Sequence, residues 1–220
     1  MITTNQLTRT FPGSKGNPVH AVRGIDLQVA PGETVAVLGP NGAGKSTLMR
    51  MLSTLLPPTS GQAEVAGLDV TRQPDAVRRL IGFVGQGNGA SHSQKVLDEV
   101  TTQARIFGLD KRAARHRAVE VLTTLGLEEL TTRKTSEMSG GQRRRLDLAM
   151  GLVHEPALLF LDEPTAGLDP QNRVRLWEHL IQVRQRTNMT VLLTTHYLDE
   201  ADRMADRVVV IDHGEVIADG

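Results

Sequence analysis

Residues 39–47, which read G-P-N-G-A-G-K-S-T, constrain the fold of this chain more than any other stretch. They fit the phosphate-binding loop pattern G-x-x-x-x-G-K-[ST]. Its fixed positions are filled by Gly39, Gly44, Lys45 and Ser46. The apolar run 34–38 before the loop predicts a buried strand, and residues 48–52 after it predict a helix, which is the order that the pattern requires. The sequence therefore predicts an α/β fold with a phosphate site between a strand and a helix.

The residue types in this loop suit a nucleoside triphosphate. Glycines let successive backbone N–H groups point inward as a nest for phosphate oxygens, and the helix that opens at Lys45 directs the positive end of its dipole to the same point. Lys45 adds a full charge at the β- and γ-phosphates, and the Ser46 hydroxyl is a ligand for Mg²⁺. The loop is completed by Pro40, Asn41, Gly42, Ala43 and Thr47. The alternative is a glycine-rich turn with an incidental lysine.

The composition excludes several classes of protein. The 220 residues include 25 Lys and Arg against 25 Asp and Glu, so no net charge favours nucleic acid or a membrane surface. Without cysteine there is neither a disulfide framework nor a thiolate site. No apolar run approaches the roughly 20 residues that span a bilayer. We expect one soluble domain with an inserted lobe, and no nucleic-acid partner.

Short strands are predicted on either side of the loop 12–18, over residues 2–11 and 19–29. Phe11 ends the first of them. The residues alone leave two interpretations of Phe11 open: a core side chain at a strand end, or an aromatic face for a nucleobase. At the other end of the chain, the segment 208–218 predicts a closing hairpin with a turn at its centre.

The most continuous apolar run, residues 157–161, ends in Asp162 and Glu163. A strand that is apolar on both faces belongs to the middle of a parallel sheet, and ligands in such sheets bind beyond the carboxyl ends of the strands. Two carboxylates are thus expected beside the phosphate loop. Asp162 is placed to hold Mg²⁺, and Glu163 to polarise an attacking water as a general base. The alternative is an acidic pair that opens a solvent loop.

His196 follows a second buried run, residues 190–195. A lone histidine at a strand end is usually structural, but this one leaves the sheet at the edge where the phosphate loop is expected, and it could donate a hydrogen bond to a γ-phosphate. The remaining histidines show no metal-ligand spacing. They are His20, His92, His116, His154, His179 and His213.

Between these two regions the pattern is helical. Residues 98–130 are predicted to be helix, with Val119, Leu122 and Leu125 at three-residue steps. A further amphipathic helix is predicted to begin at Ser139, which suits a helix N-cap. Two glycines follow Ser139, so that a phosphate could approach closely, but an ordinary serine-capped helix explains the same residues and is favoured on them alone. The run Arg143-Arg144-Arg145 is interpreted as a solvated face.

Taken together, these stretches resemble the nucleotide-binding subunit of ABC transporters over essentially the whole chain. The most specific match is Ser139-Gly140-Gly141-Gln142 upstream of Asp162, which corresponds to the family signature and reverses the interpretation of the Ser139 helix. The resemblance implies that Phe11 stacks on adenine, residues 39–47 bind the triphosphate, and Ser46 and Asp162 bind Mg²⁺. It also implies that Gln86 senses the metal and the attacking water, Glu163 is the catalytic base, Asp169 lies in a loop at a dimer interface, and His196 contacts the γ-phosphate.

The resemblance further implies one ABC ATPase domain over 1–220. Residues 1–86 and 156–220 would form the RecA-like core with a small antiparallel β part, and 87–155 the inserted helical signature lobe. Such subunits work as head-to-tail dimers with two ATP molecules between them, each held by one chain's phosphate loop and the partner's signature helix. Their further partner is a membrane-spanning permease subunit, which places the chain at the cytoplasmic face of the membrane.

More narrowly, the segments 52–58, 143–149 and 195–202 resemble ATPase subunits of daunorubicin-type drug-resistance exporters in the ABC-2 group. This implies export of a drug-like or hydrophobic molecule. Met138 replaces a more usual leucine, and Gly87–Val96 departs from the usual sequence where the membrane subunit is met. The alternatives are a soluble ABC ATPase that acts on a macromolecular machine, and a P-loop kinase or GTPase, against which the Asp162-Glu163 pair and the Ser139 signature both argue.

Overall fold

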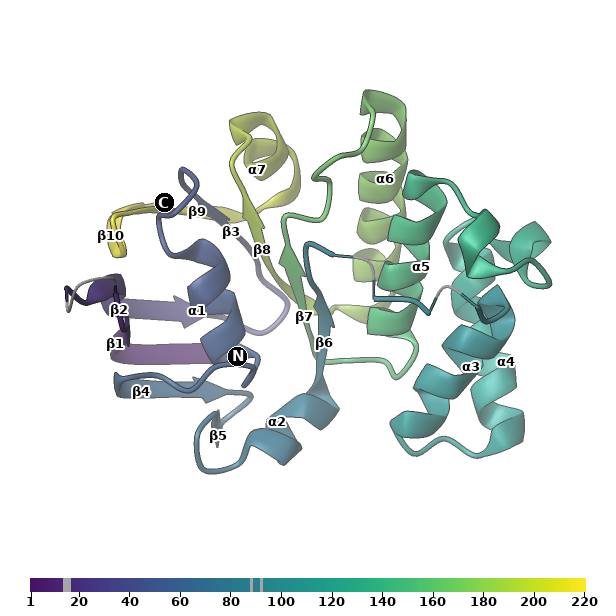
Figure 1. Ribbon diagram of the computed structural model, residues 1–220, viewed down its shortest axis with the longest axis horizontal. Helices are drawn as coiled ribbons and strands as arrows, with labels where there is room; N and C mark the ends of the chain where they lie inside the picture. The colour runs from purple at the N-terminus through teal and green to yellow at the C-terminus, as the bar shows by residue number, and fades with distance from the viewer. Residues whose placement is uncertain (14–16, 88, 92) are drawn as a thin grey trace.

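The computed structural model describes residues 1–13, 17–87, 89–91 and 93–220. Parts of the predicted loop 12–18 and of the divergent stretch Gly87–Val96, together with His92, lie outside these residues. Two sheets and a group of helices form the molecule (Figure 1). The helices are α1 (Lys45–Leu52), α2 (Pro74–Leu80), α3 (Val96–Ile106), α4 (Lys111–Thr124), α5 (Gly140–Leu152), α6 (Pro170–Thr187) and α7 (Leu198–Met204), with short 3₁₀ turns at Glu128–Leu130 and Thr135–Glu137.

The larger sheet has the spatial strand order β10-β9-β3-β8-β7-β6. In that order the strands span Glu215–Asp219, Arg207–Asp212, Thr34–Leu38, Thr190–Thr195, Leu158–Asp162 and Ile81–Val84. All neighbours pair in parallel except β10, which forms an antiparallel hairpin with β9. Every residue of β7 and β8 is buried, as expected of central strands covered on both faces. The predicted parallel sheet and closing hairpin are confirmed.

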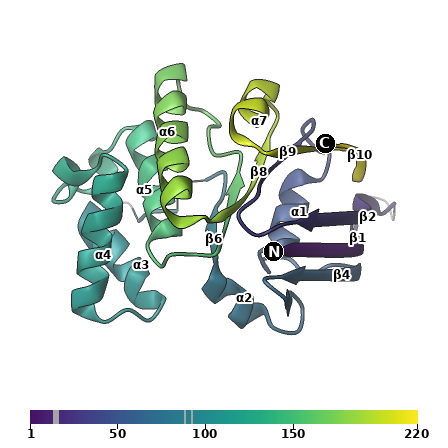
Figure 2. The ribbon, with the colours of Figure 1, turned by 180° about the vertical axis from the view of Figure 1, so that it is seen from behind.

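Side chains of β7 alternate between two apolar cores. Leu158 and Phe160 lie in one cluster with side chains of α1, while Leu159 and Leu161 lie in the other with side chains of α5 and α6. Figure 2 shows α6 and α7 on the side of the sheet that faces away in Figure 1. This alternation follows from the two-residue period of a strand, and it buries the sheet between layers.

The smaller sheet is antiparallel, in the order β2-β1-β4-β5. Its strands span Val19–Val29, Ile2–Phe11, Ser60–Val65 and Leu68–Asp69. Helix α1 lies between this sheet and the larger one (Figure 1), and its apolar side chains Leu48, Met49, Met51 and Leu52 are completely buried. The helix that follows the phosphate loop is therefore held on two sides. The predicted strands 2–11 and 19–29 are confirmed.

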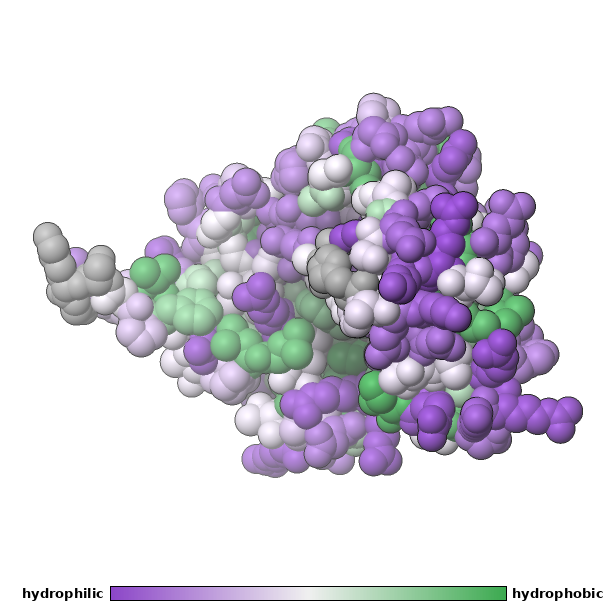
Figure 3. Space-filling model, turned by 45° about the vertical axis from the view of Figure 1, so that its right-hand side comes forward, coloured by the Kyte–Doolittle hydropathy of each residue, from purple (hydrophilic) through white to green (hydrophobic). Residues whose placement is uncertain are grey.

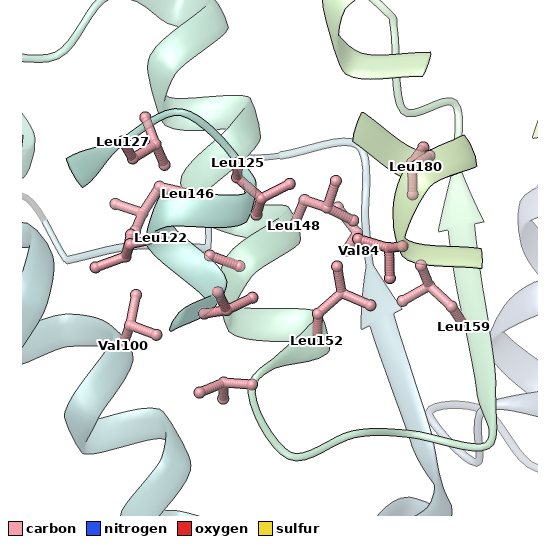
Figure 4. Packing of buried hydrophobic residues seen from close by; sticks show 14 of the residues in the cluster. Val84, Val100, Leu122, Leu125, Leu127, Leu146, Leu148, Leu152, Leu159 and Leu180 are labelled. Carbon is pink, nitrogen blue, oxygen red and sulfur yellow. The ribbon is translucent and has the colours of Figure 1, made fainter. Parts of the chain in front are cut away.

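Helices α3, α4 and α5 pack around buried leucines and valines that extend the core on the α5 and α6 side of the sheet, as Figure 4 shows. The predicted helical pattern over 98–130 is confirmed, and it divides into two helices, because α3 ends at Ile106 and α4 starts at Lys111. Gly108 between them has φ +97°, and the Asp110 side chain caps α4 by accepting from the backbone N–H of Arg112 and Ala113 at 2.8 and 3.0 Å. None of the described helices is long and apolar enough to cross a bilayer.

The sequence did not indicate α2, whose seven residues place only Val77 in a core. It also grouped Val119 with Leu122 and Leu125, but the Val119 side chain is 44% exposed while both leucines are fully buried. Steps of three residues lag behind the 3.6-residue turn, so one end of such a stripe rotates toward solvent.

These two positions of α4 form a matched pair. We expect Leu122→Ala to lower the free energy of unfolding by about 2–5 kcal/mol, because it empties a fully buried site. Val119→Ala should change it by less than about 0.5 kcal/mol, because that side chain is largely in solvent. Urea denaturation of both variants measures the difference. Equal losses would contradict the packing described for α4.

Candidate functional site

The phosphate loop joins β3 to α1, as its pattern requires. Gly44 at the helix start has φ +106°, and a Cβ there would lie 2.2 Å from the Ala21 carbonyl oxygen. A Cβ on Gly39 would lie 2.1 Å from the Ile211 carbonyl oxygen. Backbone from β2 and β9 thus closes on the loop from both sides, and only glycine fits. The loop residues Asn41–Thr47 line an open cavity together with Ala21, Gln86 and Glu163.

Lys45 is 4% exposed and lies under this loop. Its Nζ donates to the carbonyl oxygens of Gly39 and Pro40 at 2.7 and 3.1 Å, and lies 3.7 Å from Glu163 Oε1. The loop carbonyl groups thus hold the ammonium group next to the backbone N–H groups of the same loop. The arrangement suits a polyanion that would share the three donors of the ammonium group.

Four segments of the chain bring polar side chains together beside the loop. Ser46 Oγ, on α1, donates to Asp162 Oδ1 at the end of β7 over 2.9 Å, and Gln86 Nε2 lies 3.1 Å from Ser46 Oγ. Thr194 Oγ1, on β8, donates to the same Asp162 oxygen at 2.7 Å. The sequence predicted the first three residues and missed Thr194, whose strand it had identified.

A hydroxyl, a carboxylate and an amide form a hard-oxygen donor set, which fits Mg²⁺ completed by phosphate oxygens and water. The Gln86 amide would turn to present its oxygen. Among the described residues no three His, Cys, Asp or Glu side chains gather as a metal cluster. These residues therefore do not form a site in which protein carboxylates supply most of the metal ligands.

Glu163 lies between two nitrogen-bearing side chains. Its Oε2 is 3.7 Å from His196 Nδ1, and Oε1 is the oxygen that faces Lys45. The residue has φ +47°, an uncommon backbone conformation for a residue other than glycine, and its N–H donates to Thr194 Oγ1 at 3.0 Å. The carboxylate is 14% exposed, so it borders the cavity and could accept a proton from water there.

Ser139 caps α5 as predicted. Its Oγ accepts from the N–H of Gln142 at 3.3 Å, and its own N–H donates to Gln142 Oε1 at 2.8 Å, which completes a capping box. Ser139 and Gly140 are exposed, and the N–H groups of the first turn, at Gly140 and Gly141, point out of the helix. Figures 1 and 2 show α5 and α1 on opposite sides of the central strands. The structure therefore does not bring this helix start to the chain's own phosphate loop.

The interpretation of residues 143–145 as a solvated face is wrong for Arg144, which is 7% exposed. Its guanidinium donates to the carbonyl oxygens of Gly85 and Pro164 at 2.5 and 2.6 Å. Burial lowers the pKa of this guanidinium, and burial likewise raises the pKa of the Asp147 carboxyl one turn further on. A helical period from the buried Gly141 would have placed Arg144 on the inner face.

Asp169 and Phe11 lie away from this cluster. Asp169 is exposed and caps α6, and hydrogen bonds from the backbone and side chain of Asn172 hold the pKa of its carboxyl below the usual range. Phe11 is half-buried, with the Arg9 guanidinium 4.7 Å above its ring. It does not line the cavity at the phosphate loop.

Comparison with known proteins agrees with this geometry. Over 219 residues the chain is 47% identical to the daunorubicin/doxorubicin resistance ATP-binding protein DrrA of Streptomyces peucetius and 42% identical to the doxorubicin resistance ATP-binding protein DrrA of Mycobacterium tuberculosis. It is covered completely in both cases but spans only 64% and 65% of those proteins.

The structure superposes with a TM-score of 0.90 and 27% identity on the dimeric ATP-binding cassette MJ0796 in a post-hydrolysis state with ADP and Pi, covering 100% of this chain and 98% of that one. The predicted cassette fold is thereby confirmed. Residues 22–166 match the family described as ABC transporter. This chain belongs to the ABC transporter family.

Proposed function

We propose that this chain is the ATP-hydrolysing subunit of an exporter of drug-like molecules and works as a head-to-tail dimer with a separate membrane subunit. One observation carries the proposal: the phosphate loop and the capped start of α5 lie apart in one chain, and both are open to solvent. Each is half of a nucleotide site. Two copies related by a two-fold axis would complete two such sites at once.

In each site the phosphate loop and Lys45 would bind the triphosphate, and the backbone N–H groups at the start of the partner's α5, where Gly140 is exposed, would cap the γ-phosphate. Phe11 would stack on the adenine after the Arg9 guanidinium has moved off the face of its ring. Asp169 would meet the second copy at the interface. The dimeric state of the similar cassette MJ0796 supports this arrangement.

Hydrolysis would follow from positioning and charge. When bound, Mg²⁺ would neutralise charge on the β- and γ-phosphates, held by Ser46 and Asp162 and monitored by Gln86. Glu163 would accept a proton from the attacking water. His196 would donate to a γ-phosphate oxygen, and its contact with Glu163 would keep both groups on the same side of the cavity.

A membrane subunit would dock on the cleft beside the Gln86 loop. The cleft is lined by apolar side chains of the core and of the helices, including Leu55, Phe83, Phe107 and Met150. Leu55 is 59% exposed and Ile106, at the end of α3, is 72% exposed, and Figure 3 shows hydrophobic residues set into this otherwise hydrophilic face. We propose that 87–155 moves as one lobe against 1–86 and 156–220, and that the dimer lies at the cytoplasmic face of the membrane.

The rival function is an ABC ATPase that acts on a soluble machine. The names of the relatives refer to resistance to daunorubicin and doxorubicin, which favours export. We expect a neighbouring reading frame to encode a protein of about six membrane-spanning helices, each of roughly 20 apolar residues. Co-purification of the two proteins from membranes tests this. Recovery of the chain only with a soluble complex would favour the rival.

The role of Glu163 is tested by Glu163→Gln. This change keeps the shape and removes the base, so turnover of ATP should fall by about 100-fold or more while ATP still binds and holds two chains together. Steady-state phosphate release and analytical ultracentrifugation with ATP measure both effects. Glu215→Gln, an exposed position on β10, is the matched control. Turnover by a strict monomer at the wild-type rate would refute the dimer mechanism.

Sharing of each site between two chains is tested by mixing. Lys45→Ala should inactivate the site of its own chain, and Gly140→Asp the site of the partner, because a carboxylate would face the γ-phosphate. Neither variant alone should hydrolyse ATP. In an equal mixture about half of the dimers contain one chain of each variant. Such a mixed dimer carries both changes in one site and none in the other, so the mixture should recover roughly one quarter of wild-type turnover. Failure to recover any activity in verified mixed dimers would argue against a shared site.

A further inference from the structure

Helix α5 holds the loop that contains Gln86 at two points. Arg144 Nη1 donates to the Gly85 carbonyl oxygen at 2.5 Å, and Asp147 Oδ1 accepts from the Gly89 backbone N–H at 2.9 Å. The two side chains lie one turn apart on α5 and are 7% and 5% exposed. Gln86 is therefore bracketed by two buried charged groups of a single helix, which we call the Arg144–Asp147 clamp.

The clamp also reaches the carboxyl end of β7. Arg144 Nε donates to the Pro164 carbonyl oxygen at 2.6 Å, and Nη2 lies 3.3 Å from the Glu163 carbonyl oxygen and 3.5 Å from that of Asp162. Because a guanidinium is planar and presents its donors in a rigid fork, it keeps the acceptors at set separations. One side chain thus joins α5 to the Gln86 loop and to the peptide of Glu163 (Figure 1 shows α5 beside β6 and β7).

Stability alone does not account for two buried charged groups at this place. Taking them out of water is costly, and well-packed apolar side chains are often as stable or more so at such sites. Asp147 Oδ2 has no hydrogen-bond partner within the described part of the chain, so part of that cost is uncompensated. What apolar side chains could not do is bind the carbonyl oxygens and the N–H group on either side of the reactive residues.

We propose that Arg144 and Asp147 are positioning residues that make the placement of Gln86 and Glu163 depend on the position of α5. The inference rests on the proposed function, because the start of α5 would be drawn toward the nucleotide of the partner chain. When α5 moves, the clamp moves the Gln86 loop and the turn after β7, which carries Glu163, with it. Water attack in the site of one chain is then favoured only after α5 of that chain has closed on the nucleotide of the partner.

Arg144→Lys tests the clamp, because lysine keeps the charge and loses the fork. We expect kcat for ATP to fall about 10- to 100-fold, since small displacements of catalytic groups have effects of that size. The KM and the Kd for ATP should stay within about two-fold of wild type, because the phosphate loop is untouched. The control is Arg145→Lys, because Arg145 is the next residue of α5 and is half-buried rather than buried. This change should leave all three values unchanged.

Asp147 supplies an independent pair of variants. Asp147→Ala removes the acceptor for the Gly89 N–H and should lower kcat, whereas Asp147→Asn keeps an acceptor oxygen and should restore most of it. Thermal unfolding is recorded for each variant. If Arg144→Lys does not fold, the Asp147 pair decides; loss of folding in both Arg144→Lys and Asp147→Ala would assign the clamp to stability and overturn the proposal.

The outcomes separate the two hypotheses. Wild-type chain that does not hydrolyse ATP would count against the proposed function. Active wild type with folded Arg144→Lys and Asp147→Ala at unchanged kcat would count only against the clamp. Equal losses in kcat and in ATP affinity would also overturn it, because a positioning role does not require weaker nucleotide binding.

Discussion

The register of three parallel strands is the constraint on which the site depends. β3 pairs with β8 and β8 with β7, so the phosphate loop, Thr194 and Asp162 leave the sheet at one edge. The Asp162 carboxylate accepts from Ser46 and from Thr194, and this joins the loop to both neighbouring strands. A slip of one residue in either pairing would turn Asp162 into the opposite core.

Burial on both faces makes this register firm. The side chains of β7 alternate between the core around α1 and the core around α5 and α6, and neither face is exposed to water. Because packed cores deform little, β7 holds Asp162 in a fixed place at this edge. The Ser139 helix start, by contrast, is exposed and belongs to a group of helices that packs beside the sheet. The strand edge with Asp162 is one half-site, and the exposed start of α5 is a half-site that faces another molecule. This arrangement suits an enzyme whose site is completed by a second chain.

Polar groups inside the molecule connect these parts. Arg144 joins α5 to the strand ends, and Glu200, 2% exposed on α7, accepts from Thr165 and Thr195 beside the same edge at 2.5 and 2.8 Å. Arg173 Nε lies 3.5 Å from a Glu200 oxygen, which links the start of α6 to the same cluster. Such networks specify one arrangement of the elements, since a partly paired buried charge is costly.

The sequence by itself determined the phosphate loop, the order of strand and helix around it, the strands that end in Asp162 and His196, and the cap at Ser139, because each depends on local spacing and on apolar runs that have one good structural solution. Tertiary structure alone decided that Thr194 shares Asp162, that Arg144 is buried, that Val119 faces solvent and that Ser139 lies away from its own phosphate loop. These follow from how the layers pack. The local sequence around a residue does not show which carbonyl groups or which neighbouring strand its side chain will contact after folding.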